Sequence, residues 1–249
     1  WWKDARGNGL AASGPIARMD TAVVTGGTRG IGRAVAATFA DHGAHVVVCA
    51  RDGEALRRAV DDLDASGGSA TAVRADVRDE FDVERLAETA SRAGDAPGID
   101  CVVANAGVYH GTPGGTAIED VPYSAFDDTL RTNVRGVFAT VRESIPHLTP
   151  DARVLVPSGR IAREAVDGYG TYAASKAAAE AVIRQFAVET AWPMGVVDLG
   201  RVETELTGHA EGRDPDDVAP MFWWAATEAD PETVDGGVVG WREWKRATG

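Results

Sequence analysis

The stretch TAVVTGGTRGIG (21–32) decides the fold of this chain. Its first part, 21–25, is a short apolar run with β-branched residues that ends at a glycine, which predicts a buried strand. Apolar residues then recur at helical spacing over 30–42. A strand, a glycine-rich turn and an amphipathic helix in direct succession predict the start of a βαβ unit.

The same alternation continues outward to the end of the chain. The further predicted strands are 44–50, 71–77, 100–107, 153–158, 195–199 and 236–240. The predicted helices between them are 53–65, 80–92, 123–145 and 171–191. Near-continuous apolar strands separated by amphipathic helices imply a parallel sheet covered on both faces. We therefore expect an α/β fold, a doubly wound Rossmann-type sheet of about seven strands.

One domain is expected over 19–249, because no linker, internal repeat or low-complexity segment divides that range. Residues 1–18 have mixed polarity, several glycines and no periodicity, so we expect a poorly ordered tail there. No apolar run approaches the roughly 18 residues that span a bilayer, and the first residues lack the apolar core of a secretory signal. These features favour a cytoplasmic protein that does not enter a membrane.

The charge is strongly acidic, with a formal net charge of −13. Lysine occurs only at Lys3, Lys176 and Lys245. An acidic surface repels phosphate backbones, so a nucleic-acid partner is excluded. Acid excess with scarce lysine resembles proteins of salt-loving organisms; a generically acidic protein is the alternative.

Cys49 and Cys101 lie inside apolar runs, which indicates buried free thiols rather than a disulfide. The sequence contains no CxxC pair and no cluster of histidine and cysteine of the kind that binds zinc. We therefore expect no metal site.

The glycine turn has the features of a phosphate-binding loop. Glycines let the backbone approach a pyrophosphate, and the N-terminus of the following helix supplies N–H donors and a positive dipole. The spacing of Gly26, Gly30 and Gly32 is G-x-x-x-G-x-G rather than G-x-G-x-x-G, and an ordinary βα turn is the alternative. The residues expected to hold the cofactor here are Gly26, Thr28, Arg29, Gly30, Ile31 and Gly32.

The end of the second predicted strand bears on which nicotinamide cofactor fits. NAD sites place an acid there to hold the ribose 2′-hydroxyl, but this chain has Cys49-Ala50-Arg51. Arg51 and Arg29 would pair with a 2′-phosphate by charge-assisted hydrogen bonds. Asp52 either weakens that field or caps the next helix, and Arg51 is alternatively a solvated surface residue. We expect NADP(H) to be preferred, with NAD(H) possible.

Catalytic chemistry is indicated by Tyr172 and Lys176, four residues apart and so on one face of the predicted helix. A nearby ammonium and a positive nicotinamide ring favour the phenolate, which lowers the pKa of the tyrosine and suits it to general acid–base catalysis. Ser158 ends the fifth predicted strand, where its hydroxyl would hydrogen-bond the substrate oxygen. Asn133 is unusual in mid-helix, which suggests a special role; a buried amide that satisfies local backbone is the alternative.

Together these motifs resemble the short-chain dehydrogenase/reductase family, including members similar to 3-oxoacyl-ACP reductases. TGGTRGIG, Asp76, Asn105-Ala106-Gly107, Asn133, Ser158 and Tyr172-x-x-x-Lys176 occur in the family's order and approximate spacing over about 19–245. The resemblance implies a sheet in the order 3-2-1-4-5-6-7 and usually a homodimer or homotetramer.

The resemblance also implies a role for each matching residue. Tyr172 would be the acid/base, Lys176 would bind the nicotinamide ribose, Ser158 would orient substrate, and Asn133 would hold a water in a proton relay. Asp76 would meet the adenine amino group, and Asn105 would brace the central strands. The other cofactor contacts carried over are Val77, Ala106, Gly107, Gly200, Val202 and Thr204, the last toward the nicotinamide carboxamide.

The chain departs from the family pattern in several places. Ala104 replaces the first Asn of N-N-A-G, and Leu199 replaces the proline of a Pro-Gly pair. The interval from Lys176 to Gly200 is several residues short, so either the helix ends early at Trp192-Pro193 or the sixth strand is truncated. The polar segment 205–217 corresponds to a short substrate lid. The tryptophans of the C-terminal part are expected in the core or at a subunit interface; they are Trp223, Trp224, Trp241 and Trp244.

These observations predict an NADP(H)-dependent oxidoreductase that acts on a small carbonyl or secondary-alcohol substrate. Three alternatives stay open: an NAD-dependent alcohol or sugar dehydrogenase, a catalytically silent NADP-binding regulator, and a structural oligomer subunit. Intact Ser158, Tyr172 and Lys176 argue against the silent regulator, whereas the shortened region 191–200 argues for it.

Overall fold

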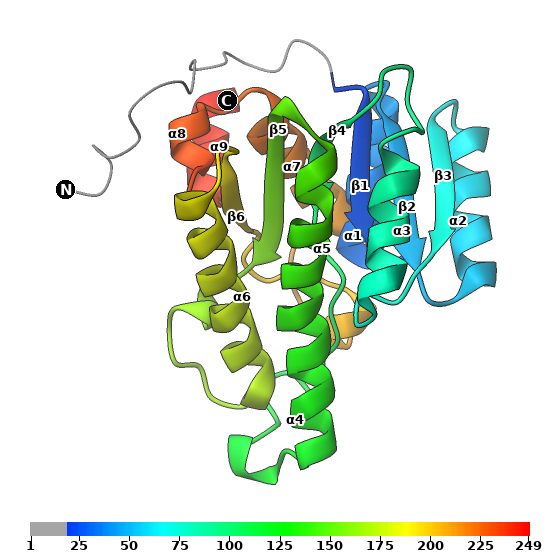
Figure 1. Ribbon diagram of the computed structural model, residues 1–249. Coiled ribbons are helices and arrows are strands. Elements are labelled where there is room, and N and C mark those ends of the chain that lie inside the picture. Colours follow the sequence, from blue (N-terminus) through cyan, green and yellow to red (C-terminus); the bar gives the residue numbers. More distant parts are fainter. Residues whose placement is uncertain (1–18) are drawn as a thin grey trace.

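One parallel sheet forms the centre of the computed structural model, which describes residues 19–249 (Figure 1). The strands are β1 (Thr21–Thr25), β2 (His45–Ala50), β3 (Ser69–Arg74), β4 (Ile99–Val103), β5 (Leu148–Ser158), β6 (Met194–Asp198) and β7 (Val238–Gly240). They pair in the order β3-β2-β1-β4-β5-β6-β7, which confirms the predicted topology. The expected tail at 1–18 lies outside the described residues.

Helices cover both faces of the sheet. The helices on one face are α1 (Gly30–Asp41), α2 (Gly53–Ala65) and α7 (Pro215–Thr227). Those on the other are α3 (Glu80–Ala90), α5 (Gly136–Ser144) and α6 (Gly170–Glu189). Two short helices, α8 (Pro231–Val234) and α9 (Trp241–Thr248), lie at the C-terminal end of the chain. Within the described residues no helix is long and apolar enough to cross a membrane.

The strands are apolar on both sides because each side packs against helices. In β1 every residue is buried, and Val24 joins one core while Val23 joins the other. This alternation follows from the two-residue period of a strand. Cys49 and Cys101 are buried and free, as the sequence predicted.

The helix predicted over 123–145 carries an interruption that no periodicity reveals. It consists of α4 (Tyr123–Leu130), a π-helical turn at Arg131–Arg135, and α5. In Figure 1, α4 extends beyond the sheet below α5. Such π turns are frequent at functional sites, and this one contains Asn133.

The shortened region before Gly200 leaves the sixth strand intact. β6 pairs with β5 along its whole length, from Val154↔Met194 to Ser158↔Asp198, and also pairs with β7. The helix expected to 191 ends at Glu189, and the indole of Trp192 donates to the Thr149 carbonyl oxygen at 2.8 Å. Only the connection is short, so the strand is not truncated.

Several strand boundaries differ from the prediction. β4 ends at Val103 rather than at 107, so Asn105, Ala106 and Gly107 lie in the loop that follows it, and β7 starts at Val238 rather than at 236. β3 ends at Arg74, because the chain turns away after it and the Asp76 amide donates to Asp82 of α3 at 2.9 Å. Asp76 and Val77 therefore lie beyond the strand. β5 starts five residues earlier than 153, since Leu148 pairs with Ile99 before a register shift.

The C-terminal tryptophans are mostly core residues. Trp224 and Trp244 are buried, and Trp223 packs edge-on against Phe39 of α1. Trp241 packs partly buried against the same core and also lines the large cleft described next.

Candidate active site

A cleft of about 1620 Å³ opens at the carboxyl ends of the strands. That edge of a doubly wound sheet is where ligands bind, and the volume exceeds the roughly 300–1,000 Å³ usual for a small-molecule site. All predicted site residues except Asn133 line it. They are Gly26, Thr28, Arg29, Gly30, Ile31, Gly32, Arg51, Asp76, Val77, Asn105, Ala106, Gly107, Ser158, Tyr172, Lys176, Gly200, Val202 and Thr204.

The glycine turn after β1 has the shape of an anion cradle. Gly26 and Gly30 have φ of 67° and 51°, which side chains rarely adopt. A Cβ at Gly32 would lie 2.3 Å from the Gly26 carbonyl oxygen. No side chain caps the start of α1, so its N–H groups face the cleft without a side-chain partner. These features fit a dinucleotide pyrophosphate.

Asn105 holds the cradle against β4. Its Nδ2 donates to the carbonyl oxygens of Thr25 at 2.9 Å and Gly26 at 3.3 Å. The Thr25 hydroxyl accepts from the amides of Asn105 and Ala106, each at 3.0 Å. Asn105 thus joins the ends of β1 and β4, the bracing position that the family resemblance implies.

Arg51 and Asp76 lie at the β2–β3 end of the cleft. Arg51 is exposed and its carbonyl oxygen accepts from Arg74 Nε at 3.0 Å. Asp52 caps α2 by accepting from the Glu54 and Ala55 amides, so its carboxylate is committed to the helix.

The carboxylate of Asp76 is held by Arg78, which also binds Asp128 at 2.5 Å. Hydrogen bonds from Arg78 hold the pKa of Asp76 below its ordinary value, so the side chain is an anion that accepts hydrogen bonds. The sequence prediction missed Arg78.

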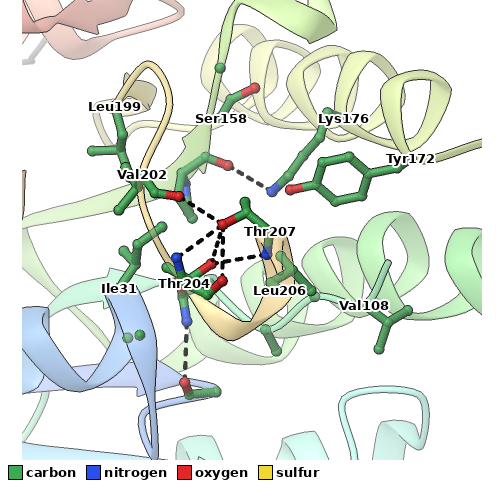
Figure 2. A pocket seen from close by; sticks show the side chains of 18 of the residues that line it. Ile31, Val108, Ser158, Tyr172, Lys176, Leu199, Val202, Thr204, Leu206 and Thr207 are labelled. Atoms are coloured by element: carbon green, nitrogen blue, oxygen red, sulfur yellow. Dashed lines mark hydrogen bonds between the residues drawn. The ribbon is translucent and has the colours of Figure 1, made fainter. Parts of the chain in front are cut away.

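Tyr172 and Lys176 stand on successive turns of α6, as their spacing predicts. In Figure 2 the phenol oxygen and the lysine nitrogen point to the same region of the cleft. Lys176 Nζ lies 5.8 Å from the centre of the Tyr172 ring and donates to the Pro157 carbonyl oxygen at 3.0 Å. The Tyr109 ring packs 4.8 Å from the Tyr172 ring and limits its movement.

The electrostatics of this pair differ from the expectation that Lys176 lowers the pKa of Tyr172. Burial raises the pKa of the Tyr172 phenol and lowers the pKa of Lys176 to about 8. Loss of hydration is the largest cause of both shifts. The expectation also included the positive charge of a bound nicotinamide ring.

Ser158 lines the cleft, but its hydroxyl is not presented to Tyr172. Figure 2 shows the Ser158 side chain turned away from the phenol. Its Oγ is buried and makes no hydrogen bond within residues 19–249. No hydrogen bond holds the hydroxyl in this rotamer, and a substrate-orienting role would require it to rotate about Cα–Cβ toward the phenol.

Asn133 lies behind the cleft, in the π turn. Its Oδ1 accepts from the Val108 amide at 2.8 Å, and its Nδ2 donates to the Val108 carbonyl oxygen and the Ser175 hydroxyl, each at 2.9 Å. The side chain therefore joins the β4 loop to α6. This matches the alternative of a buried amide satisfying local backbone.

The predicted lid is a short loop fastened at both ends. Arg213 donates its amide to the Arg201 carbonyl oxygen at 2.9 Å and accepts the Glu203 amide at 2.9 Å, while α7 begins directly afterwards. A short helix, Glu205–Thr207, is capped by Thr204 and faces the phosphate loop. There Glu205 binds Arg29 at 2.6 Å across the cleft.

Arg163 is a lining residue that the sequence prediction missed. It binds the buried carboxylate of Glu180 at 2.8 Å and also pairs with Asp198 at the end of β6. Glu180 lies one turn beyond Lys176 on α6, a spacing visible in the sequence. Arg163 lies on a loop, so no periodicity identifies it as a partner.

Comparison with known proteins agrees with the geometry. The sequence pattern of the short chain dehydrogenase family matches residues 20–213. The 1-deoxy-11-beta-hydroxypentalenate dehydrogenase of Streptomyces exfoliatus is 36% identical over 218 residues, which are 81% of this chain and 78% of that protein. A rhamnolipids biosynthesis 3-oxoacyl-[acyl-carrier-protein] reductase of Pseudomonas aeruginosa is 33% identical over 198 residues, 76% of this chain and 75% of that protein.

Solved structures give the same result. A short chain dehydrogenase from Burkholderia cenocepacia in complex with NADP superposes with a TM-score of 0.78 at 26% identity, covering 89% of this chain and 95% of that one. A dehydrogenase/reductase from Sinorhizobium meliloti superposes with a TM-score of 0.79 at 27% identity, covering 91% and 94%. The chain belongs to the short-chain dehydrogenase family, and it is an oxidoreductase with a nicotinamide dinucleotide site.

Proposed function

We propose that this protein transfers a hydride between NADP(H) and a small carbonyl or secondary-alcohol substrate, with Tyr172 as the proton donor and acceptor. The observation that carries the proposal is the convergence of the Tyr172 hydroxyl and the Lys176 amine on one part of the cleft (Figure 2). The cradle after β1 ends in the same cleft. The nicotinamide supplies or accepts the hydride when it is bound.

Tyr172 has the properties needed for the proton step of reduction. Burial keeps its phenol protonated, so it holds a proton to donate to the substrate oxygen as negative charge develops there. Lys176 would bind the ribose hydroxyls and, when protonated, stabilise the phenolate that remains. Packing against Tyr109 restricts the ring to one orientation, which lowers the entropic cost of the step.

Ser158 and Asn133 complete the proposed mechanism. Ser158 would donate a second hydrogen bond to the substrate oxygen after rotation of its side chain. The π turn around Asn133 would hold a water between the solvent and Lys176, so that the amine and the phenol regain their proton. Thr204, Gly200 and Val202 would contact the nicotinamide end.

A preference for NADP(H) is part of the proposal. It is supported by Arg51, which makes no ion pair within residues 19–249, and by Arg29 in the phosphate loop. Asp52 is committed to capping α2 and does not accept from a ribose hydroxyl in its present position. An NAD-dependent alcohol or sugar dehydrogenase is the closest alternative.

A homodimer or homotetramer in the cytoplasm is the proposed state of the protein. Exposed aromatic side chains on α4 and α5 support self-association: Tyr123 is 90% exposed, and Phe126 and Phe138 are each 41% exposed. Light scattering on the purified protein would measure the mass directly.

The decisive experiment compares the wild type with Tyr172→Phe on a panel of ketones and secondary alcohols. We expect the variant to lose at least about 100-fold in kcat, because general acid–base catalysis contributes roughly 10²–10⁴-fold. Its Kd for NADPH should stay within about twofold. Tyr169→Phe, which alters another tyrosine lining the cleft, is the matched control. Turnover that survives Tyr172→Phe contradicts the proposal, and NADPH binding with no turnover by the wild type favours the silent regulator.

A further inference from the structure

Arginines without a carboxylate partner gather in the cleft of this acidic protein. Elsewhere many arginines bind a neighbouring acid, as Arg33 does with Asp62 at 2.8 Å. Five arginines that line the cleft make no such pair within residues 19–249. They are Arg51, Arg201, Arg213, Arg242 and Arg246.

Four of these arginines follow β6 or β7, on the other side of the sheet centre from Arg51. Arg51 follows β2, whereas Arg242 and Arg246 belong to α9, which begins where β7 ends. The sheet order separates β2 from β7 by five strand-to-strand steps, or about 24 Å. One phosphate at Arg51 therefore cannot also satisfy the cations on α9.

A chain of contacts brings the four arginines together. Arg201 and Arg213 are joined by a backbone hydrogen bond of 2.9 Å. The guanidinium of Arg213 donates to the Leu199 carbonyl oxygen at 2.9 Å and stacks on the Trp241 ring at 4.4 Å. Trp241 begins α9 and is followed by Arg242, and Arg246 is one turn further along the helix.

Few negative charges oppose this group, which we call the arginine cluster (Arg201, Arg213, Arg242 and Arg246). Asp198 lines the same part of the cleft but is paired with Arg163. Glu243 also lines the cleft and forms no ion pair with its neighbours on α9 within the described residues. Among the residues that line this part of the cleft, four guanidinium groups face one carboxylate without an ion pair, which leaves a positive region beside the nicotinamide end. Glu203 and Asp214 adjoin Arg213 in the structure but do not line the cleft.

The geometry points to an anionic substrate, a carbonyl or alcohol compound whose carboxylate or phosphate ester binds the arginine cluster. This inference rests on the proposed function, because it places the reacting carbon near Tyr172 and the anion toward α9. Guanidinium groups bind carboxylates and phosphates through paired, charge-assisted hydrogen bonds. Remote contacts of this kind orient a substrate for the reaction at its other end.

The kinetic test uses matched pairs of substrates in which one member is an anion and the other is neutral. Acetoacetate is compared with its methyl ester, and dihydroxyacetone phosphate with dihydroxyacetone, each with NADPH. For the preferred anion we expect Arg242→Gln/Arg246→Gln to lower kcat/KM about 30-fold or more, since hydrogen bonds to charged groups are lost. The neutral partner should change by less than about twofold. The pair that responds tells a carboxylate from a phosphate.

A binding test separates this inference from the proposed function. The NADP⁺-saturated protein is titrated calorimetrically with succinate and with inorganic phosphate, neither of which can be reduced. We expect one of these anions to bind the wild type. Its affinity for Arg242→Gln/Arg246→Gln should be at least about tenfold lower, whereas Arg242→Lys/Arg246→Lys, which keeps both charges, should still bind it. Arg57→Gln removes a charge from an exposed residue of α2 outside the cleft lining and should leave binding unchanged.

Each outcome has one meaning. Equal binding of both anions to the wild type and the double variant, or no binding to either, overturns the arginine cluster as an anion site. Anion binding that is lost in the double variant, in a protein that reduces no carbonyl, supports the cluster and contradicts the proposed function. An unchanged Kd for NADPH in the double variant checks that the fold and the cofactor site are intact.

Discussion

Lys176 donates a hydrogen bond from Nζ to the Pro157 carbonyl oxygen at 3.0 Å, which ties the amine on α6 to the end of β5. The partner is a neutral carbonyl, so it orients the amine without neutralising it. The nearest acid on the helix, Glu180, is buried and already bound by Arg163 and Arg184. Burial therefore dominates and lowers the pKa of Lys176 to about 8.

This arrangement predicts a descending limb in the pH profile of reduction. The buried phenol of Tyr172 keeps its proton throughout, because its pKa is raised. Lys176 is protonated below about pH 8 and neutral above it, so the positive charge that stabilises the phenolate is lost as pH rises. We expect kcat/KM for NADPH to fall above about pH 8, since this constant reports groups in the free enzyme.

Lys176→Arg is the matched control for the pH profile. A guanidinium stays charged at all these pH values, so the descending limb should shift to higher pH even if kcat is lower. A limb that keeps its position in Lys176→Arg would assign the titration to another group.

Periodicity predicted the doubly wound parallel sheet and the shared helix face of Tyr172 and Lys176, whereas the strand order was implied by the family resemblance. The sequence predicted strand and helix boundaries less well where the contact that fixes them is with a residue far away in the sequence. The segment 148–152 contains Pro150 and Asp151 and reads as a loop, yet Leu148 pairs with Ile99 and extends β5. The π turn was also invisible, because one extra residue in a helical turn leaves the hydrophobic spacing on either side unchanged.

Helix α7 was missed although a local signal for it exists. Asp214 accepts from the Asp216 amide at 2.9 Å as the N-cap, and Pro215 follows at the first helical position. That pair is a recognised helix start. The directions of the Ser158 and Arg29 side chains carry no such signal, since they depend on packing at the ends of β5 and of the lid.

Arg51→Ala should weaken NADPH binding far more than NADH binding. Arg51 lines the β2–β3 end of the cleft and makes no ion pair within residues 19–249, so a 2′-phosphate would be its first anionic partner. Loss of hydrogen bonds to a charged group costs about 1.5–3 kcal/mol, so the Kd for NADPH should rise about 10- to 100-fold. Fluorescence titration of both cofactors measures the ratio.

Arg57→Ala is the control for Arg51, because Arg57 is an exposed arginine of α2 that does not line the cleft. Equal losses of NADPH and NADH affinity in Arg51→Ala would remove the 2′-phosphate argument.

Glu205→Gln should tighten NADPH binding. Arg29 must leave Glu205 before it can pair with a cofactor phosphate, and both side chains are largely exposed, at 68% and 58%. Such a surface pair is worth about 0–1 kcal/mol, so the Kd should fall by no more than about fivefold. Glu203→Gln removes the same charge from a neighbouring exposed residue that does not line the cleft. If both variants bind NADPH equally well, general electrostatics rather than the Arg29–Glu205 pair explains the change.

Ser158→Ala tests whether the buried hydroxyl rotates toward the substrate. A donor to the developing oxyanion is worth about 10²–10³-fold in kcat, so we expect a loss of that order, with NADPH affinity unchanged. A wild-type kcat in Ser158→Ala would mean that Oγ keeps the orientation seen in Figure 2 and takes no part in the reaction.

Gly159→Ser then becomes informative, because Gly159 also lines the cleft and a Cβ there would meet only the Gly200 carbonyl oxygen, at 3.6 Å. A rise in kcat in that variant would identify position 159, rather than 158, as the place from which a hydroxyl reaches the substrate.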